Sequence, residues 1–94
     1  MQSRISVNVQ IPSILQQSTG GQQVIEVEGQ NIAQCLDYMD RQFPGIKKEL
    51  CDEEGRLFSY IRIYIDGEMA SSGELTMSVN AGDRLIILPA ITGG

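Results

Sequence analysis

The 94-residue sequence predicts an α+β fold in which a mixed five-stranded sheet carries one main helix on one face. Three observations support this prediction. Several short segments alternate apolar and polar residues, which is typical of half-buried strands. One segment repeats apolar residues at helical spacing, and the last apolar run has no alternation. Because one helix covers only one face of five strands, the order strand, strand, helix, strand, strand, strand indicates a sheet that grasps a single helix.

The first two predicted strands form a hairpin with a long connection. The segment Arg4–Ile11 places its apolar residues at alternate positions, and Pro12 ends it because proline has no N–H for the ladder. The segment Gln23–Glu28 alternates again. Between the two strands, residues Ser18–Gln22 are rich in turn formers.

The predicted helix begins after Asn31, whose side chain is suited to cap a helix N-terminus, and it ends before Pro44-Gly45. Its apolar positions fall on one face of the helix: Ile32, Leu36, Met39 and Phe43. Cys35 flanks this face and is expected in the core. Residues Ile46–Leu50 are expected to form a short further turn.

The remaining three strands follow a polar loop over Cys51–Arg56. The segment Ile61–Ile65 has isoleucine at every second position, and Asp66-Gly67 after it is a strong hairpin-turn signal. We expect the next short strand near Leu75–Val79, where alternation is weak. The final strand, Arg84–Leu88, is apolar on both faces and is therefore expected in the middle of the sheet.

The final strand also predicts a docking surface. If Leu85 and Ile87 face the helix, the neighbouring side chains point to the uncovered face of the sheet. An exposed apolar patch on such a face marks a binding surface. The candidate docking residues for a partner protein are Arg62, Tyr64, Ile86 and Leu88.

Composition excludes several classes of function. A net charge of −5 argues against a nucleic-acid-binding basic patch, and the absence of histidine removes Ser-His and Cys-His nucleophile pairs. No apolar run is long enough to cross a membrane, and no signal-peptide pattern opens the chain, so we expect a cytoplasmic protein. Cys35 and Cys51 are expected as free or buried thiols, with acidic neighbours raising the pKa of Cys51. We expect no bound metal or cofactor and no enzymatic activity of the chain itself.

The C-terminal pair Gly93-Gly94 is the one candidate reactive site. Two residues without Cβ atoms allow the backbone to enter a narrow channel and present a bare carboxylate. We therefore expect a domain over residues 1–89 and a flexible Gly-Gly tail over residues 90–94.

The Gly82-Asp83 turn, the apolar final strand and the exit Leu88-Pro89-Ala90-Ile91-Thr92-Gly93-Gly94 resemble the MoaD/ThiS family of ubiquitin-like sulfur carriers. The resemblance extends over essentially the whole chain and implies a ubiquitin-like β-grasp fold. Within the family, Ile11-Pro12-Ser13-Ile14-Leu15, Thr19-Gly20-Gly21-Gln22 and Ser72-Gly73 are similar to CysO-type carriers.

The resemblance implies a protein cosubstrate whose carboxylate at Gly94 is adenylated by an E1-like enzyme of the MoeB/ThiF type, which uses ATP. Sulfide or a persulfide then leaves a thiocarboxylate on Gly94. Access to the partner would be given by the residues that lead to it: Pro89, Ala90, Ile91, Thr92 and Gly93. Some relatives carry extra residues beyond Gly-Gly that a protease removes, and for the sequence as given we expect no such step.

The sequence leaves several alternatives for the sulfur acceptor and for the class of function. For a CysO-type carrier the sulfur acceptor is a PLP-dependent cysteine synthase. A second reading is the small subunit of molybdopterin synthase, whose tail would enter the large subunit, although those subunits commonly show a Pro-Pro-Val exit that differs from Leu88-Pro89-Ala90-Ile91. A ubiquitin-like modifier of target lysines and a plain interaction module are the rivals from other classes.

Overall fold

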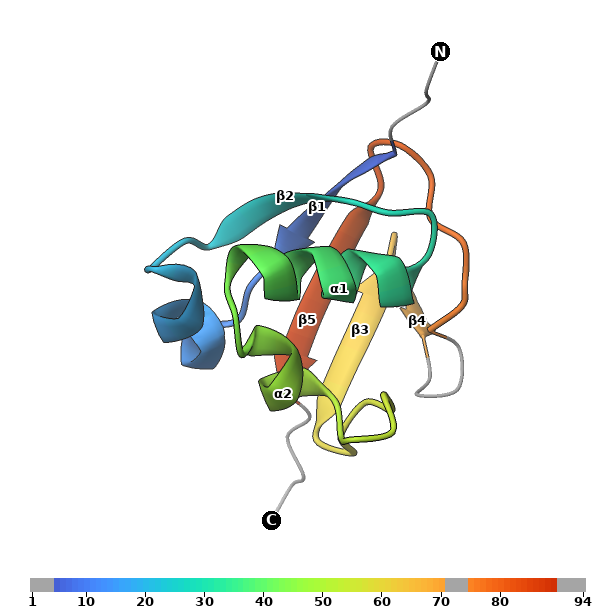
Figure 1. The fold of residues 1–94 in the computed structure, drawn as a ribbon. Helices are drawn as coiled ribbons and strands as arrows, with labels where there is room; N and C mark the ends of the chain where they lie inside the picture. Colours follow the sequence, from blue (N-terminus) through green and yellow to red (C-terminus); the bar gives the residue numbers. More distant parts are fainter. Residues whose placement is uncertain (1–4, 71–74, 90–94) are drawn as a thin grey trace.

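The computed structural model describes residues 5–70 and 75–89, and within them five strands form one sheet (Figure 1). The strands are β1 (Ser6–Gln10), β2 (Val24–Glu28), β3 (Ile61–Ile65), β4 (Glu68–Ala70) and β5 (Arg84–Pro89). The helices are the 3₁₀-helix η1 (Ser13–Thr19) and the α-helices α1 (Ile32–Gln42) and α2 (Ile46–Leu50). The predicted tail, residues 90–94, and Ser72-Gly73 lie outside the described residues.

The sheet is mixed, with the order β2-β1-β5-β3-β4. Strands β1 and β5 pair in parallel, and the other neighbours pair antiparallel. The predicted hairpin of the first two strands is confirmed by the antiparallel β1–β2 pair. The position of β5 between β1 and β3 confirms that the doubly apolar strand occupies the middle of the sheet, where both of its edges are bonded.

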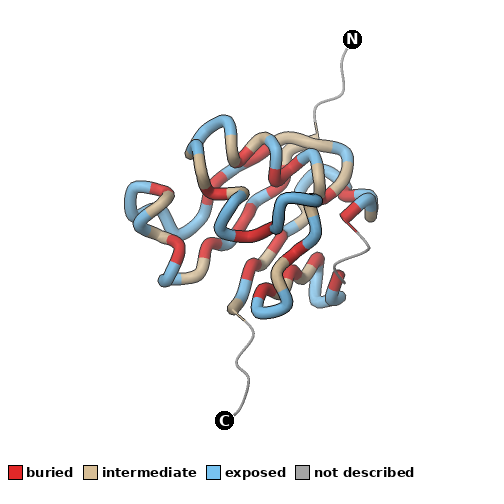
Figure 2. Tube along the Cα trace, turned by 60° about the horizontal axis from the view of Figure 1, so that its bottom comes forward, coloured by how far each residue is buried: buried red, intermediate tan, exposed pale blue. Residues whose placement is uncertain are grey.

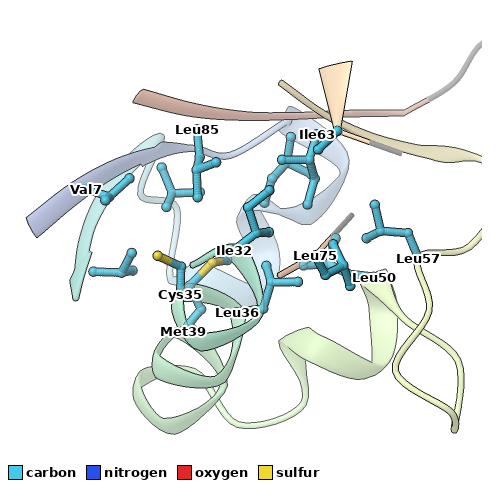
Figure 3. Packing of buried hydrophobic residues seen from close by; sticks show 14 of the residues in the cluster. Val7, Ile32, Cys35, Leu36, Met39, Leu50, Leu57, Ile63, Leu75 and Leu85 are labelled. Carbon is cyan, nitrogen blue, oxygen red and sulfur yellow. The ribbon is translucent and has the colours of Figure 1, made fainter. Parts of the chain in front are cut away.

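Helices α1 and α2 lie on the same side of the sheet (Figure 1). The side chain of Asn31 accepts a hydrogen bond from the Gln34 backbone N–H at 2.8 Å, as its predicted capping role requires. The buried face of α1 is formed by Ile32, Cys35, Leu36 and Met39, and Figure 3 shows these side chains directed toward the sheet. Phe43 ends the helix and is only partly buried. One helix face and one sheet face thus make a single core.

Burial alternates along the strands, as Figure 2 shows in the change from buried to exposed positions. In β5, Leu85 and Ile87 are buried, while Leu88 is exposed and Ile86 is half-buried. In β3 all three isoleucines are buried, and Arg62 and Tyr64 between them are half-buried. The predicted facing of both strands is therefore the observed one.

The predicted strand near Leu75–Val79 is wrong. The two-residue turn Asp66-Gly67, with φ of 49° and 89°, returns the chain at once, so that β4 pairs with β3 from Ile65↔Glu68 onward. Residues 75–79 instead supply hydrogen bonds to the start of α1. The Ile32 and Ala33 N–H groups donate to the Met77 and Leu75 carbonyls at 3.2 and 2.8 Å. Because the first N–H groups of a helix have no partner within the helix, this segment satisfies them while burying Leu75 and Val79.

The connection from β1 to β2 contains the 3₁₀-helix η1, which the sequence pattern did not predict. The buried Thr19 side chain closes it, because its hydroxyl lies 3.2 Å from the Gln16 carbonyl and 2.8 Å from the Gln22 carbonyl. Gly20 follows in the left-handed region with φ of 65°. The short α2 was expected, and it packs through Ile46 and Leu50.

Among the described residues, no helix has both the length and the apolar character that a membrane span requires.

Because α1 and α2 lie on one side of the sheet, the described part of the chain presents two different surfaces: a helical side, and a sheet face that no described helix covers.

Candidate functional site

The four predicted docking residues lie together on the uncovered face of the sheet. They form two neighbouring cross-strand pairs between β3 and β5: Tyr64 opposite Ile86, and Arg62 opposite Leu88. Side chains that are directly opposite on one sheet face have Cβ atoms about 5 Å apart, so each pair is in contact range. We call these four residues the sheet-face patch.

The sheet-face patch combines exposed apolar side chains with one positively charged side chain, Arg62, whose position is fixed by hydrogen bonds. Leu88 is 41% exposed, which is unusual for a leucine in a central strand. The Arg62 guanidinium does not extend freely, because it donates hydrogen bonds to the Ser59 carbonyl at 2.7 Å and the Ile61 carbonyl at 3.3 Å. The charge is thereby kept beside Leu88 at the rim of the patch.

Sequence reasoning missed two residues that extend the patch. On β4, Met69 is opposite Tyr64 and is 51% exposed. On the other side, Gln10 of β1 pairs with Ile86 of β5, and Val24 of β2 pairs with Gln10. One row therefore crosses all five strands, from Val24 to Met69. The signal for Met69 was available, since a two-residue Asp-Gly turn fixes the register of the strand after it.

Strand β5 ends directly beside the patch. Pro89 is the last residue of β5 and is opposite Ile61, so it still belongs to the sheet and is not yet part of an extended stalk. As a proline it donates no ladder hydrogen bond beyond this point. The other predicted access residues, Ala90, Ile91, Thr92 and Gly93, and the predicted reacting residue Gly94 lie outside the described residues.

An aromatic pair borders the same end of the sheet. The rings of Phe58 and Tyr60 stack with centroids 5.2 Å apart and an interplanar angle of 6°. The Ile61 N–H donates to the Phe58 carbonyl at 3.0 Å, which fixes this pair to the start of β3. Tyr60 is 51% exposed.

Neither cysteine offers a reactive thiol. Both are free and buried, as expected. Burial raises the pKa of Cys35 to about 11. Burial is also the main cause that raises the pKa of Cys51. The Lys47 charge acts in the opposite direction, and Asp52 and Asp37 raise the pKa to a smaller extent, so acidic neighbours are only a minor cause. Within residues 5–70 and 75–89, no cluster of three His, Cys, Asp or Glu residues is placed to hold a metal ion.

The sequence model of the ThiS family matches residues 9–94. The sulfur carrier protein CysO of Mycobacterium tuberculosis is 33% identical over 93 residues, covering 96% of this chain and all of that protein. The small archaeal modifier protein 1 of Haloferax volcanii is 30% identical over 71 residues, covering 74% of this chain and 78% of that protein.

A solved structure gives the same answer for the fold. A chain of the crystal structure of the Amycolatopsis orientalis BexX/CysO complex superposes with a TM-score of 0.85 at 39% identity, covering 94% of this chain and 99% of that chain. This likeness confirms the predicted ubiquitin-like β-grasp fold.

Proposed function

The chain belongs to the ThiS family and is a homologue of the sulfur carrier CysO, and from this premise we propose that it carries sulfur as a thiocarboxylate on Gly94. The observation that carries the proposal is the position of the sheet-face patch. Two cross-strand pairs present apolar and cationic groups at the end of β5, and β5 is the strand that leads into Gly93-Gly94. A partner seated on the patch receives the tail.

The chemistry follows from the end group. An α-carboxyl with a pKa near 3.5 is ionised at neutral pH, so it attacks a phosphorus atom readily but resists attack at its own carbon. In the proposed reaction an oxygen of the Gly94 carboxylate attacks the α-phosphorus of ATP, and pyrophosphate leaves. Sulfide then attacks the activated carbonyl carbon, AMP leaves, and a thiocarboxylate remains. If the donor is a persulfide, its attack gives an acyl disulfide, and a thiol then cleaves the S–S bond to release the thiocarboxylate and is itself left in a disulfide with the donor. An E1-like enzyme of the MoeB/ThiF type supplies the active site for both steps.

The length and composition of the tail suit a reaction at an active site inside a partner enzyme. The residues Ala90–Gly94 reach about 17 Å when extended at roughly 3.4 Å per residue. The two glycines leave only backbone at the reacting end. The domain therefore stays on the partner's surface while Gly94 reaches a buried catalytic centre.

The proposed sulfur acceptor is a PLP-dependent cysteine synthase, because a relative that matches nearly the full chain is a CysO protein. The alternative acceptor is the large subunit of molybdopterin synthase. A pull-down with the thiocarboxylated protein, followed by identification of the bound enzyme, separates the two. Recovery of a PLP enzyme supports cysteine synthesis, and recovery of a molybdopterin synthase subunit contradicts it.

A second candidate function is protein modification, since one relative is a small archaeal modifier protein. Both functions start with adenylation of the carboxylate, so they are separated by the product. We would incubate the full chain with an activating enzyme, ATP and sulfide, and measure intact mass. Exchange of one oxygen for sulfur at the C-terminus supports the carrier, and conjugates to other proteins support the modifier. If neither product forms, both functions are wrong.

A further inference from the structure

Strand β2 is an outer strand of the sheet, with β1 as its neighbour on one side (Figure 1). In the part of the chain that the structure describes, no strand pairs with the other side of β2. Such an edge presents backbone N–H and C=O groups to which another extended chain can pair. The question is which residues offer these groups, and to what kind of chain.

The hydrogen bonds at the two ends of the β1–β2 ladder fix the direction of the backbone groups in β2. The Ile11 N–H donates to the Gln23 carbonyl at 2.8 Å. The Gly29 N–H donates to the Ile5 carbonyl at 3.1 Å. In an antiparallel pair, every second residue points its N–H and C=O toward the neighbouring strand. Residues 25 and 27 therefore point these groups toward β1.

Val24 and Glu26 point their N–H and C=O groups outward, where an added strand can bond them. Both side chains are exposed, Val24 to 55%, and they lie on the sheet face that no described helix covers. Glu26 has no ion pair or side-chain hydrogen bond within residues 5–70 and 75–89. The edge thus offers one apolar and one anionic side chain at alternate positions.

The charge of this edge disfavours a second copy as its occupant. In a twofold antiparallel pairing of β2 with β2 centred on Glu26, the two Glu26 carboxylates are directly opposite, and like charges so placed are destabilising. Each copy also carries a net charge of −5, which adds repulsion. A basic residue opposite Glu26 turns the same geometry into attraction.

The helical side of the edge has room for the side chains of an added strand. Successive side chains of a strand point to opposite faces, so every second one would point to this side. An open hollow of about 440 Å³ lies there, lined by Glu28 of β2 and by Gln34, Asp37, Asp40 and Arg41 of α1. Because Asp37 and Asp40 are already bonded within the chain, the hollow contributes space and not free charge.

We propose that the outer edge of β2 binds an extended segment of a partner protein as an added antiparallel strand. In that segment a lysine or arginine lies opposite Glu26, and an apolar residue two positions later lies opposite Val24. Backbone hydrogen bonds to Val24 and Glu26 supply affinity, and the two side chains supply specificity. The inference does not depend on activation of Gly94.

The test adds a blocked peptide, Thr-Thr-Lys-Thr-Val-Thr-Thr, to the full chain and measures amide hydrogen exchange. We expect exchange at Val24 and Glu26 to slow, whereas Ile25 and Val27, which point toward β1, are unchanged. N-methylation of the peptide at its lysine and valine removes the N–H groups that face β2 and abolishes the protection. N-methylation of the threonine between them, whose N–H faces away, preserves it.

A charge swap tests the specificity. Glu26→Lys is expected to weaken binding of the lysine peptide about fivefold, measured by NMR titration. A peptide with glutamate in place of lysine binds Glu26→Lys better than it binds the unsubstituted protein. Glu68→Lys, exposed on the opposite outer strand β4, is the matched control and keeps the original affinity. Melting transitions verify that both variants are folded.

Several results would overturn the inference. Slow exchange at Val24 and Glu26 in the concentrated protein without peptide would assign the edge to a second copy. Peptide binding that is indifferent to the charge swap would remove the role of Glu26. Protection confined to Ile86 and Tyr64 would place the peptide on the sheet-face patch. Unchanged exchange up to the solubility limit of the peptide would contradict strand addition itself.

Discussion

The buried thiol of Cys35 shows how one residue links packing to pH. Its side chain is inaccessible and packs on the α1 face, and burial raises its pKa from 9.0 to about 11. The unfolded chain ionises first as pH rises, so the folded state holds more protons between these two values. Stability from this group is therefore complete below pH 9 and is lost as pH rises toward 11.

We predict that the Cys35 contribution falls by about 3 kcal/mol over this pH range, since each pKa unit corresponds to roughly 1.4 kcal/mol. Urea unfolding measured at several pH values checks this. Other groups also titrate above pH 9, so Cys35→Ala serves as the comparison: it lowers stability below pH 9 through lost packing but shows a shallower decline above that pH. Equal slopes for the two proteins would contradict the assigned cause.

At the scale of a single element, helix α1 depends on its first turn. Asn31 caps the Gln34 N–H, and the segment of residues 75–79 bonds the Ile32 and Ala33 N–H groups. We predict that Asn31→Ala lowers the free energy of unfolding by about 1 kcal/mol, because one helix N–H loses its partner. Asn31→Asp is the matched control and should stay near the original value. A thermal or urea transition unchanged in Asn31→Ala would show that the carbonyls of residues 75–79 alone cap the helix.

Strand β5 carries a second prediction at this scale. Ile86 and Ile87 are adjacent, but Ile86 faces the sheet-face patch and Ile87 is 1% exposed in the core. Ile86→Asp is expected to slow adenylation while the protein stays folded, since it places a charge in the docking surface and not in the core. The matched variant Ile87→Asp should unfold, as a buried unpaired carboxylate costs several kcal/mol. If Ile86→Asp unfolds, or if it stays folded and is adenylated at the normal rate, the sheet-face patch is not the docking surface.

The elements also show where sequence patterns succeed and fail. Helical spacing found α1, and alternation found β1, β2 and β3, because burial on one side imposes these periods. The same reasoning misplaced the fourth strand. Residues Leu75 and Val79 are buried as in a strand, but their segment bonds a helix end, and apolar pattern does not reveal where backbone hydrogen bonds go. The helix η1 was missed because a Thr19 side chain, not a periodic apolar face, closes it.

For the molecule as a whole, the proposed function assigns docking to the sheet-face patch and chemistry to Gly94. The mixed sheet brings residues 62–64 and 86–88 together at the exit of the chain, although they are far apart in sequence. Strand facing predicted the four residues of the patch, because the central position of β5 followed from its two apolar faces. The Asp66-Gly67 turn could have predicted the position of Met69. The place of Val24 in the row depends on the registers of β1 with β2 and β5, and these required the three-dimensional structure.

The central claim is that the whole domain serves one reacting group, Gly94. Deletion of Gly94 tests it most directly, with sulfur transfer measured by intact mass in the presence of an activating enzyme, ATP and sulfide. Because β5 ends at Pro89, the deletion removes no strand residue. We predict that sulfur transfer is abolished while the melting transition is nearly unchanged. Transfer at the original rate by the truncated protein would contradict the account.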